Sequence, residues 1–134
     1  MSVRKRKLEY AFGLYLNADG RRVFDKDGAE ILQALEEYGS IAAAAKNLEI
    51  SYKFTWNYLV GMTKSLHQPI VVTRRGTTQF ARRKGGGGTT LTPVARVLLK
   101  QFRGTELFMQ RILSRRGSPT TATTVSNANR KATS

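Results

Sequence analysis

Residues 39–56 constrain the fold more than any other stretch, because they have the pattern of two short helices joined by a tight turn. Ser40 is suited to an N-cap, and apolar residues recur behind it at helical spacing as far as Leu48. Four consecutive alanines leave room for another helix to approach closely. The periodicity breaks at residues 49–50, and Ser51 is placed to cap a second helix. This pattern fits a helix-turn-helix or an ordinary helical hairpin, and the flanking chain must distinguish them.

The second helix is predicted from Ser51 to about Leu66, and its two faces differ in character. The face expected to pack in the core comprises Trp56, Leu59, Val60 and Thr63. The opposite face, which is rich in hydrogen-bonding groups, comprises Lys53, Phe54, Asn57, Tyr58, Gly61 and Lys64. A supported helix with such an outward face is able to enter the DNA major groove.

Composition narrows the possible functions. A chain of 134 residues is expected to form one domain. It has no cysteine and a single histidine, His67, and we find no paired carboxylates or nucleophile–base set, so we expect neither an enzyme nor a metal or cofactor site. No apolar run approaches the roughly 20 residues of a membrane span. The simplest expectation is a cytoplasmic, nucleoid-associated protein.

The net charge of +14 is distributed unevenly along the chain. Residues 1–49 hold eight basic and eight acidic side chains, whereas residues 50–134 hold fifteen basic side chains and only Glu106 as an acid. The whole excess therefore begins at the second helix of the predicted helix-turn-helix. Such a field favours a polyanionic partner, with nucleic acid as the first candidate and an anionic membrane surface as the second.

The N-terminal quarter is predicted to contain an arm, a hairpin and a helix. Residues 1–8 form a basic arm that either contacts phosphates or is simply solvated. Residues 9–24 alternate in a short period around an Asp19-Gly20 turn signal, which predicts a hairpin. A helix is expected over residues 26–38, with Asp27 and Glu30 at capping-box spacing and Gly39 after its end. Its predicted apolar stripe is Ile31, Leu32, Leu35 and Tyr38.

After Leu66 the pattern changes to two short strands, residues 70–73 and 89–92, which predict a β-wing. The segment between them contains glycines 85–88 and five basic residues without an acid: Arg74, Arg75, Arg82, Arg83 and Lys84. These charges repel one another in isolation, so a nearby polyanion would relieve them. A flexible loop without contacts is the alternative. A nucleotide-binding loop is disfavoured, because the P-loop spacing is absent.

A long helix is predicted over residues 92–115, with threonine at the cap and proline at the first helical position. Its apolar residues continue beyond the length of helix that a small winged domain can cover. We therefore expect its distal part to pack on a second subunit, through Phe102, Leu107, Phe108, Met109, Ile112 and Leu113. The alternative is that it folds back on the hairpin of the same chain. Residues 116–134 have almost no apolar residues, and we expect a disordered tail.

Several motifs together resemble the N-terminal domain of ModE-type molybdate-responsive regulators and, more distantly, LysR-type regulators. The residues that carry the resemblance lie within 12–103 and are Gly39-Ser-Ile-Ala-Ala-Ala-Ala-Lys46, Ile50-Ser-Tyr-Lys53, Trp56, Met62, glycines 85–88 and Leu91-Thr-Pro-Val-Ala-Arg96. The resemblance implies a mainly α fold with a small β component. This is a winged helix-turn-helix with an N-terminal hairpin and a long C-terminal helix, here over residues 9–115, that dimerises and binds a palindromic operator.

The sequence departs from the family at three places. ModE-type proteins carry molybdate in domains C-terminal to this one, and the sequence shows no such domain, so we expect a stand-alone domain without a small-molecule effector. The turn residue that is commonly glycine is Glu49, and the segment 74–84 is longer and more basic than the usual wing.

The function predicted from the sequence is sequence-specific binding of double-stranded DNA by a homodimeric transcriptional regulator. Ser51, Tyr52 and Lys53 match the resembled motif, and Asn57 suits a bidentate contact to adenine. Phe54 either presses a thymine methyl group or is partly buried. Residues expected on phosphates are Lys64 and the wing residues Arg74, Arg75, Arg82, Arg83 and Lys84. The alternative is an architectural protein that coats DNA with little sequence preference.

Overall fold

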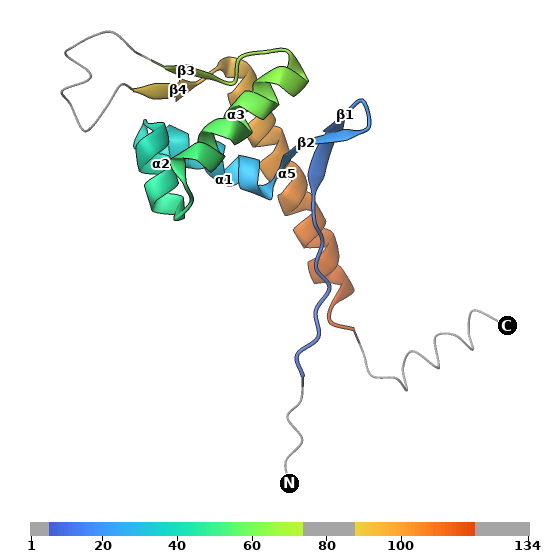
Figure 1. Cartoon of the computed structure of the whole chain (residues 1–134). Helices are drawn as coiled ribbons and strands as arrows, with labels where there is room; N and C mark the ends of the chain where they lie inside the picture. The colour runs from blue at the N-terminus through green and yellow to red at the C-terminus, as the bar shows by residue number, and fades with distance from the viewer. Residues whose placement is uncertain (1–5, 74–87, 120–134) are drawn as a thin grey trace, which may run out of the picture. The chain divides into compact units, whose positions relative to one another are not determined.

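The computed structural model describes residues 6–73 and 88–119 of the chain (Figure 1). The described residues divide into two compact units, one being Gly13–Glu106 and the other residues 6–12 with 107–119. The elements in chain order are β1 (Tyr15–Ala18), β2 (Arg21–Asp25), α1 (Lys26–Tyr38), α2 (Ile41–Leu48), α3 (Tyr52–Leu66), β3 (Val71–Thr73), β4 (Thr89–Leu91) and α5 (Pro93–Arg116). None of the helices in the described ranges is long and apolar enough to cross a membrane.

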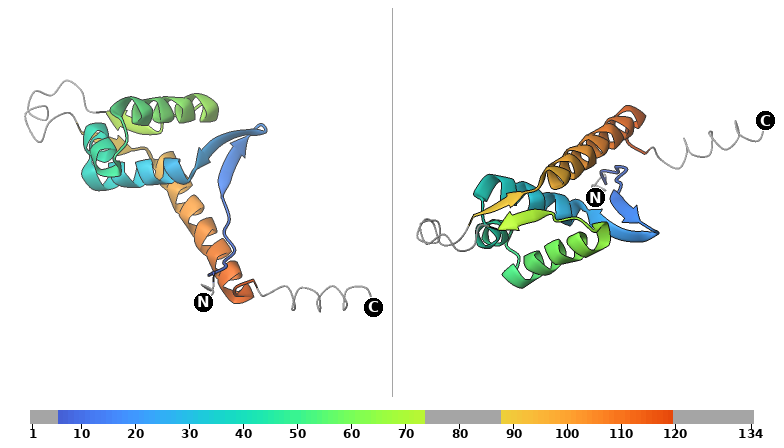
Figure 2. Two further views of the ribbon diagram at one scale, coloured as in Figure 1. Left: turned by 60° about the horizontal axis from the view of Figure 1, so that its bottom comes forward. Right: turned by 90° about the horizontal axis from the view of Figure 1, so that it is seen from above.

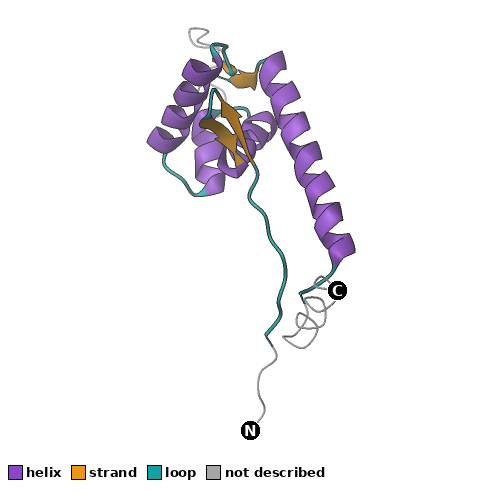
Figure 3. Cartoon of the chain, turned by 90° about the vertical axis from the view of Figure 1, so that its right-hand side faces the viewer, coloured by secondary structure: helices purple, strands orange, loops and turns teal. Residues whose placement is uncertain are grey.

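The predicted fold class is confirmed: the described residues are mainly helical, with a helix-turn-helix made by α2 and α3 and two small antiparallel sheets. In one unit, the β3–β4 sheet lies between α3 and the start of α5 (Figure 2), and Figure 3 shows the same order from the side. The buried core of this unit draws on α1, α2, α3, both sheets and α5; its members include Phe24, Ile31, Leu32, Leu35, Ile41, Leu59, Met62, Ile70, Leu91 and Phe102.

The N-terminal hairpin turns where predicted, at Asp19 and Gly20, which both have positive φ. It is shorter than predicted, because strand β1 begins at Tyr15 and residues 9–14 are not in a strand. The reason is the length of its partner. Tyr15 pairs with Asp25, where β2 ends and α1 begins, so the residues before Tyr15 have no partner across the turn.

Helix α1 has the predicted bounds but not the predicted cap. Its N-cap is Asp25, whose carboxylate accepts a hydrogen bond from the Gly28 amide at 3.3 Å, and not Asp27. Three members of the predicted stripe are buried, whereas Tyr38 is exposed at the last position of the helix. Gly39 ends the helix with φ 74°, as expected of a residue that adopts the left-handed conformation readily.

The base of the wing is tied to the helical core by backbone hydrogen bonds. The Thr89 amide donates to the Gly39 carbonyl at 2.7 Å, and the Thr92 amide donates to the Ile70 carbonyl at 3.0 Å. The Thr92 hydroxyl donates to the Pro69 carbonyl at 2.8 Å and accepts from the Ala95 amide at 3.4 Å, so it also caps α5. The two strands therefore leave the core at a fixed place beside α1.

Candidate nucleic-acid interface

The turn between α2 and α3 is built from two side-chain caps and one left-handed residue. The Ser40 hydroxyl accepts from the Ala43 amide at 3.0 Å, and the Ser51 hydroxyl accepts from the Phe54 amide at 3.0 Å. Between these caps, Glu49 takes φ 58° and its amide donates to the Ala45 and Lys46 carbonyls. Glu49 thus has the conformation that glycine would adopt with less strain, and the tight turn is preserved.

The outward face of α3 presents polar and aromatic groups together. The structure places six of the predicted DNA-binding residues on the exposed side of α3 and its cap: Ser51, Tyr52, Lys53, Phe54, Asn57 and Lys64. Two of the aromatic rings, those of Tyr52 and Phe54, are 50% and 46% exposed. Basic and amide side chains with apolar rings beside them are able to contact both the phosphates and the base edges of DNA.

The buried face of α3 is rotated from the predicted one. The buried residues are Thr55, Leu59 and Met62, whereas Trp56, which was assigned to the core, is 42% exposed. Thr55 can be fully buried because its hydroxyl donates to the Ser51 carbonyl at 2.9 Å, which satisfies its polar atom inside the helix. The rotation places Trp56 on the exposed surface of the helix, beside the other exposed side chains of the candidate interface.

The rotation also turns Tyr58 inward, although it was predicted on the outward face. Tyr58 is half-buried, and its hydroxyl donates to the Asp25 Oδ1 at 2.6 Å. Desolvation by burial, followed by the hydrogen bond and negative charge of Asp25, raises the pKa of Tyr58 above its ordinary value. The phenol therefore stays protonated and donating. Sequence periodicity does not reveal this contact, because its partners are 33 residues apart.

The five wing residues that complete the predicted site lie outside the described residues; they are Arg74, Arg75, Arg82, Arg83 and Lys84. The predicted N-terminal arm and tail fall largely outside them as well, since residues 1–5 and 120–134 are not described. The strands β3 and β4, which flank the wing residues in the sequence, pair in register from Val71 with Leu91 to Thr73 with Thr89.

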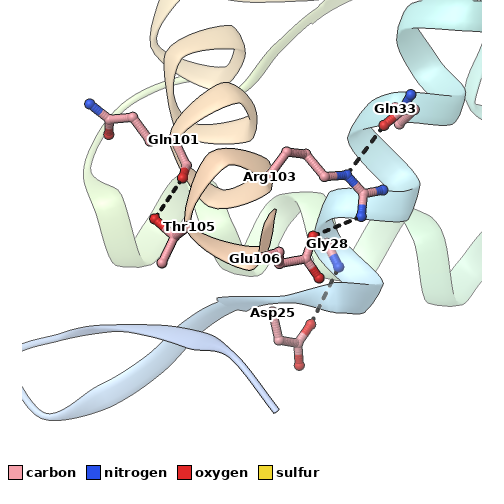
Figure 4. Close-up of polar contacts among 7 residues, drawn as sticks. All are labelled: Asp25, Gly28, Gln33, Gln101, Arg103, Thr105 and Glu106. Atoms are coloured by element: carbon pink, nitrogen blue, oxygen red, sulfur yellow. Dashed lines mark hydrogen bonds and ion pairs between the residues drawn. The ribbon is translucent and has the colours of Figure 1, made fainter. Parts of the chain in front are cut away.

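Two arginines in the first half of α5 are paired with acids of the same unit. Arg96 lies 3.3 Å from the Glu36 carboxylate, and Arg103 lies 3.0 Å from that of Glu106. Arg103 also donates to the Gln33 side chain at 3.3 Å, as Figure 4 shows. Arg96 and Glu36 are both exposed, so their pair adds little stability, whereas the Arg103–Glu106 pair is partly buried. Both pairs reduce the charge that this side of the molecule offers to a polyanion.

The residues predicted for dimerisation fall into two groups. Phe102 is only 5% exposed and packs in the core of its own chain, so we do not include it in a subunit interface. The exposed members are Leu107, Phe108 and Ile112, while Met109 and Leu113 are half-buried. In this second unit, residues 9–12 of the same chain line a cleft together with Leu113 of α5.

Three curated relatives are similar to part of this chain. They are the transcriptional regulator ModE of Haemophilus influenzae, 36% identical over 78 residues, the molybdenum-pterin-binding protein MopB of Rhodobacter capsulatus, 34% over 107 residues, and the molybdenum transport protein ModE of Azotobacter vinelandii, 36% over 85 residues. The matches span 58, 78 and 63% of this chain but only 28, 36 and 29% of those relatives. The predicted resemblance to ModE-type proteins is confirmed.

Two solved structures were also found, each with a TM-score of 0.47 and 22% identity over 66% of this chain. One is ArgP from Mycobacterium tuberculosis, of which 29% is covered, and the other is the DNA complex of the CbnR DBD, of which 88% is covered. No protein-family model matches the chain.

Proposed function

We propose that this chain binds double-stranded DNA as a transcriptional regulator, with α3 as its recognition helix in the major groove. The observation that supports this most is the exposed ridge of α3, where Lys53, Asn57 and Lys64 face solvent while the other side of the helix is fixed in the core. The relatives named as transcriptional regulator and as ModE support a role in regulation.

Within this proposal the α3 residues have different tasks. Asn57 forms the bidentate contact to adenine, and Lys53 reaches guanine or phosphate near the start of the helix. Phe54 and Trp56 supply apolar contact on its flanks, since both rings are about half exposed. Ser51 and Tyr52 lie at the N-terminal end, where backbone amides also approach the duplex.

The wing and the long helix complete the proposed complex. We propose that Arg74, Arg75, Arg82, Arg83 and Lys84 hold phosphates or enter the minor groove, because they are five of the fifteen basic residues after Ile50. We propose a second copy of the chain as the partner of the exposed apolar residues of α5. Leu107, Phe108 and Ile112 are 48, 54 and 44% exposed, and covering them would remove an apolar patch from water.

The test of sequence-specific binding is a selection of duplexes from a randomised pool, followed by measurement of the specificity ratio. A ratio of about 10³ or more between the recovered duplex and a scrambled one supports regulation. A ratio near one supports the architectural alternative, which the net charge of +14 favours. Absence of binding to any duplex at low ionic strength would exclude both functions.

The role of the wing is tested by the salt dependence of binding. If a dimer makes about ten phosphate contacts, the logarithm of its binding constant should fall with log salt at a slope of roughly −9. Replacing Arg82, Arg83 and Lys84 together by alanine should flatten that slope by about 5, counting both copies. The control removes three charges from α5, by the alanine substitutions of Lys100, Arg111 and Arg115. An equal effect in the control would remove the wing from the proposal.

A further inference from the structure

Tyr58 and Asp25 form a two-way polar contact between α3 and the junction of β2 with α1. The Tyr58 hydroxyl donates to the Asp25 Oδ1 at 2.6 Å, and the Asp25 amide donates back to the same hydroxyl at 3.3 Å. A short bond to a carboxylate is stronger and more directional than an apolar contact. This contact therefore restricts the rotation of α3 more sharply than the packing of its apolar residues.

The Asp25 carboxylate is itself held in place. Its Oδ1 accepts from the Gly28 amide at the start of α1, as Figure 4 shows, and its Oδ2 lies 3.8 Å from the Arg22 guanidinium. Asp25 is also the last residue of β2 and pairs with Tyr15. An acceptor fixed by a strand end and by a helix N-terminus is a rigid anchor for the phenol.

The space around this anchor is closed. A Cβ atom on Gly28 would lie 2.7 Å from the Tyr58 hydroxyl and 2.7 Å from two ring atoms of Phe24. On its other side, the Tyr58 ring packs against Phe54, with centroids 6.2 Å apart. A line of contacts thus runs from α1 through Tyr58 to Phe54, which belongs to the proposed DNA surface.

Resting on the proposed function, we propose that Tyr58 is a positioning residue for DNA recognition. Its hydrogen bond to Asp25 fixes the rotation of α3, so that the neighbouring Asn57 and the adjacent Phe54 reach base edges in register. The buried residues Thr55, Leu59 and Met62 hold the helix against the core but are compatible with small rotations, since apolar contact is not directional. Loss of the bond loosens base contacts and leaves phosphate contacts largely intact.

The experiment compares Tyr58→Phe with Tyr38→Phe in the full chain. Both variants lose one phenolic oxygen, and Tyr38 is exposed on α1, outside the proposed interface. Affinities are measured for the duplex that wild type selects from a random pool and for poly(dI-dC), well below the unfolding temperature of each variant. Amide hydrogen exchange of α3 is measured on the same proteins without DNA. Asp25→Asn serves as the conservative partner, because its amide oxygen still accepts.

We expect Tyr58→Phe to bind the selected duplex roughly tenfold more weakly, to bind poly(dI-dC) within about twofold of wild type, and to exchange its α3 amides faster. Asp25→Asn should fall between Tyr58→Phe and wild type. Equal affinities for Tyr58→Phe and Tyr38→Phe, or equal losses on both DNA probes, would overturn the inference. If wild type binds no duplex, the proposed function fails, whereas unchanged α3 exchange in Tyr58→Phe overturns the positioning role by itself.

Discussion

The ring of Phe102 on α5 meets the ring of Phe24 at the end of β2 edge-on, with centroids 5.0 Å apart and planes at 90°. Both side chains are buried, at 5% and 0% exposure. This arrangement suits the quadrupoles of two aromatic rings and joins the first half of α5 to the strand before α1.

Phe102→Ala should therefore lower the free energy of unfolding by about 3–5 kcal/mol, because it leaves a cavity in the core. Phe108→Ala, at a side chain that is 54% exposed, should change it by less than about 1 kcal/mol. Urea denaturation at a concentration where the chain is monomeric measures both. Sedimentation equilibrium separates the roles, since we expect Phe108→Ala to weaken self-association. Similar stabilities for the two variants would contradict the assignment of Phe102 to the core.

Glu49→Gly should stabilise the protein by about 0.5–1 kcal/mol, because glycine adopts a left-handed backbone without the strain that a Cβ brings. Glu49 has φ 58° at the turn between α2 and α3. Glu49→Ala separates charge from strain and should give no stabilisation. Ala42→Gly, at an exposed position inside α2, should destabilise by about 1 kcal/mol. Thermal and urea unfolding measure the stabilities of wild type and the three variants. A Glu49→Gly variant no more stable than Glu49→Ala would show that the backbone of Glu49 is not strained.

Stability should fall at high pH through Tyr58. Burial and the Asp25 carboxylate raise the pKa of Tyr58 in the folded protein, whereas the phenol of the unfolded chain ionises near its ordinary value of about 10. The stabilisation of the folded state by the Tyr58 phenol is therefore complete below about pH 10. It is lost as the pH rises beyond that value, because only the folded state retains the proton. Wild type should lose up to about 1.4 kcal/mol per pH unit more than Tyr58→Phe.

Urea denaturation of both proteins at pH 9, 10 and 11 measures this difference in slope. The Asp25 carboxylate contacts the phenol directly, and the Arg22 guanidinium lies 3.8 Å from that carboxylate. Parallel curves for wild type and Tyr58→Phe across this range would show that the phenol titrates alike in the folded and unfolded chains.

Asn57→Ala should weaken binding to the preferred duplex by about 1–3 kcal/mol and leave binding to random duplex unchanged, because a lost amide contact affects base readout only. The free energy of unfolding should not change, since Asn57 is exposed on α3. Asn47→Ala, an exposed amide on α2, is the matched control. Fluorescence anisotropy on both duplexes gives the four affinities. A uniform loss on both duplexes would place Asn57 on the phosphates instead.

Helix ends were predictable because their causes are local. Ser40 and Ser51 bond to amides three residues ahead, Gly39 needs only its own backbone freedom, and the Thr92-Pro93 pair begins α5 as expected. The helix-turn-helix therefore follows from short stretches of sequence. Even the departure at Glu49 is local, since one residue takes the strained conformation and the turn keeps its geometry.

The residues of α3 that face the core were not predictable from periodicity alone. Apolar spacing favoured Trp56 as the core residue, but Thr55 is buried in its place because its hydroxyl bonds within the helix. The cap of α1 was missed for a related reason: Asp25 and Asp27 both suit the N-terminus, and Asp25 is also tied to Tyr58 on α3. A contact between residues 33 positions apart cannot be predicted from the pattern of neighbouring residues.

The absence of a side chain at residue 28 has a genetic consequence. Every single-base missense change in a glycine codon introduces a Cβ atom, and at this position that atom would lie 2.7 Å from Tyr58 and from the fully buried ring of Phe24. In a library of random codon changes, every missense allele at this position should therefore displace the Tyr58 hydroxyl or the Phe24 ring.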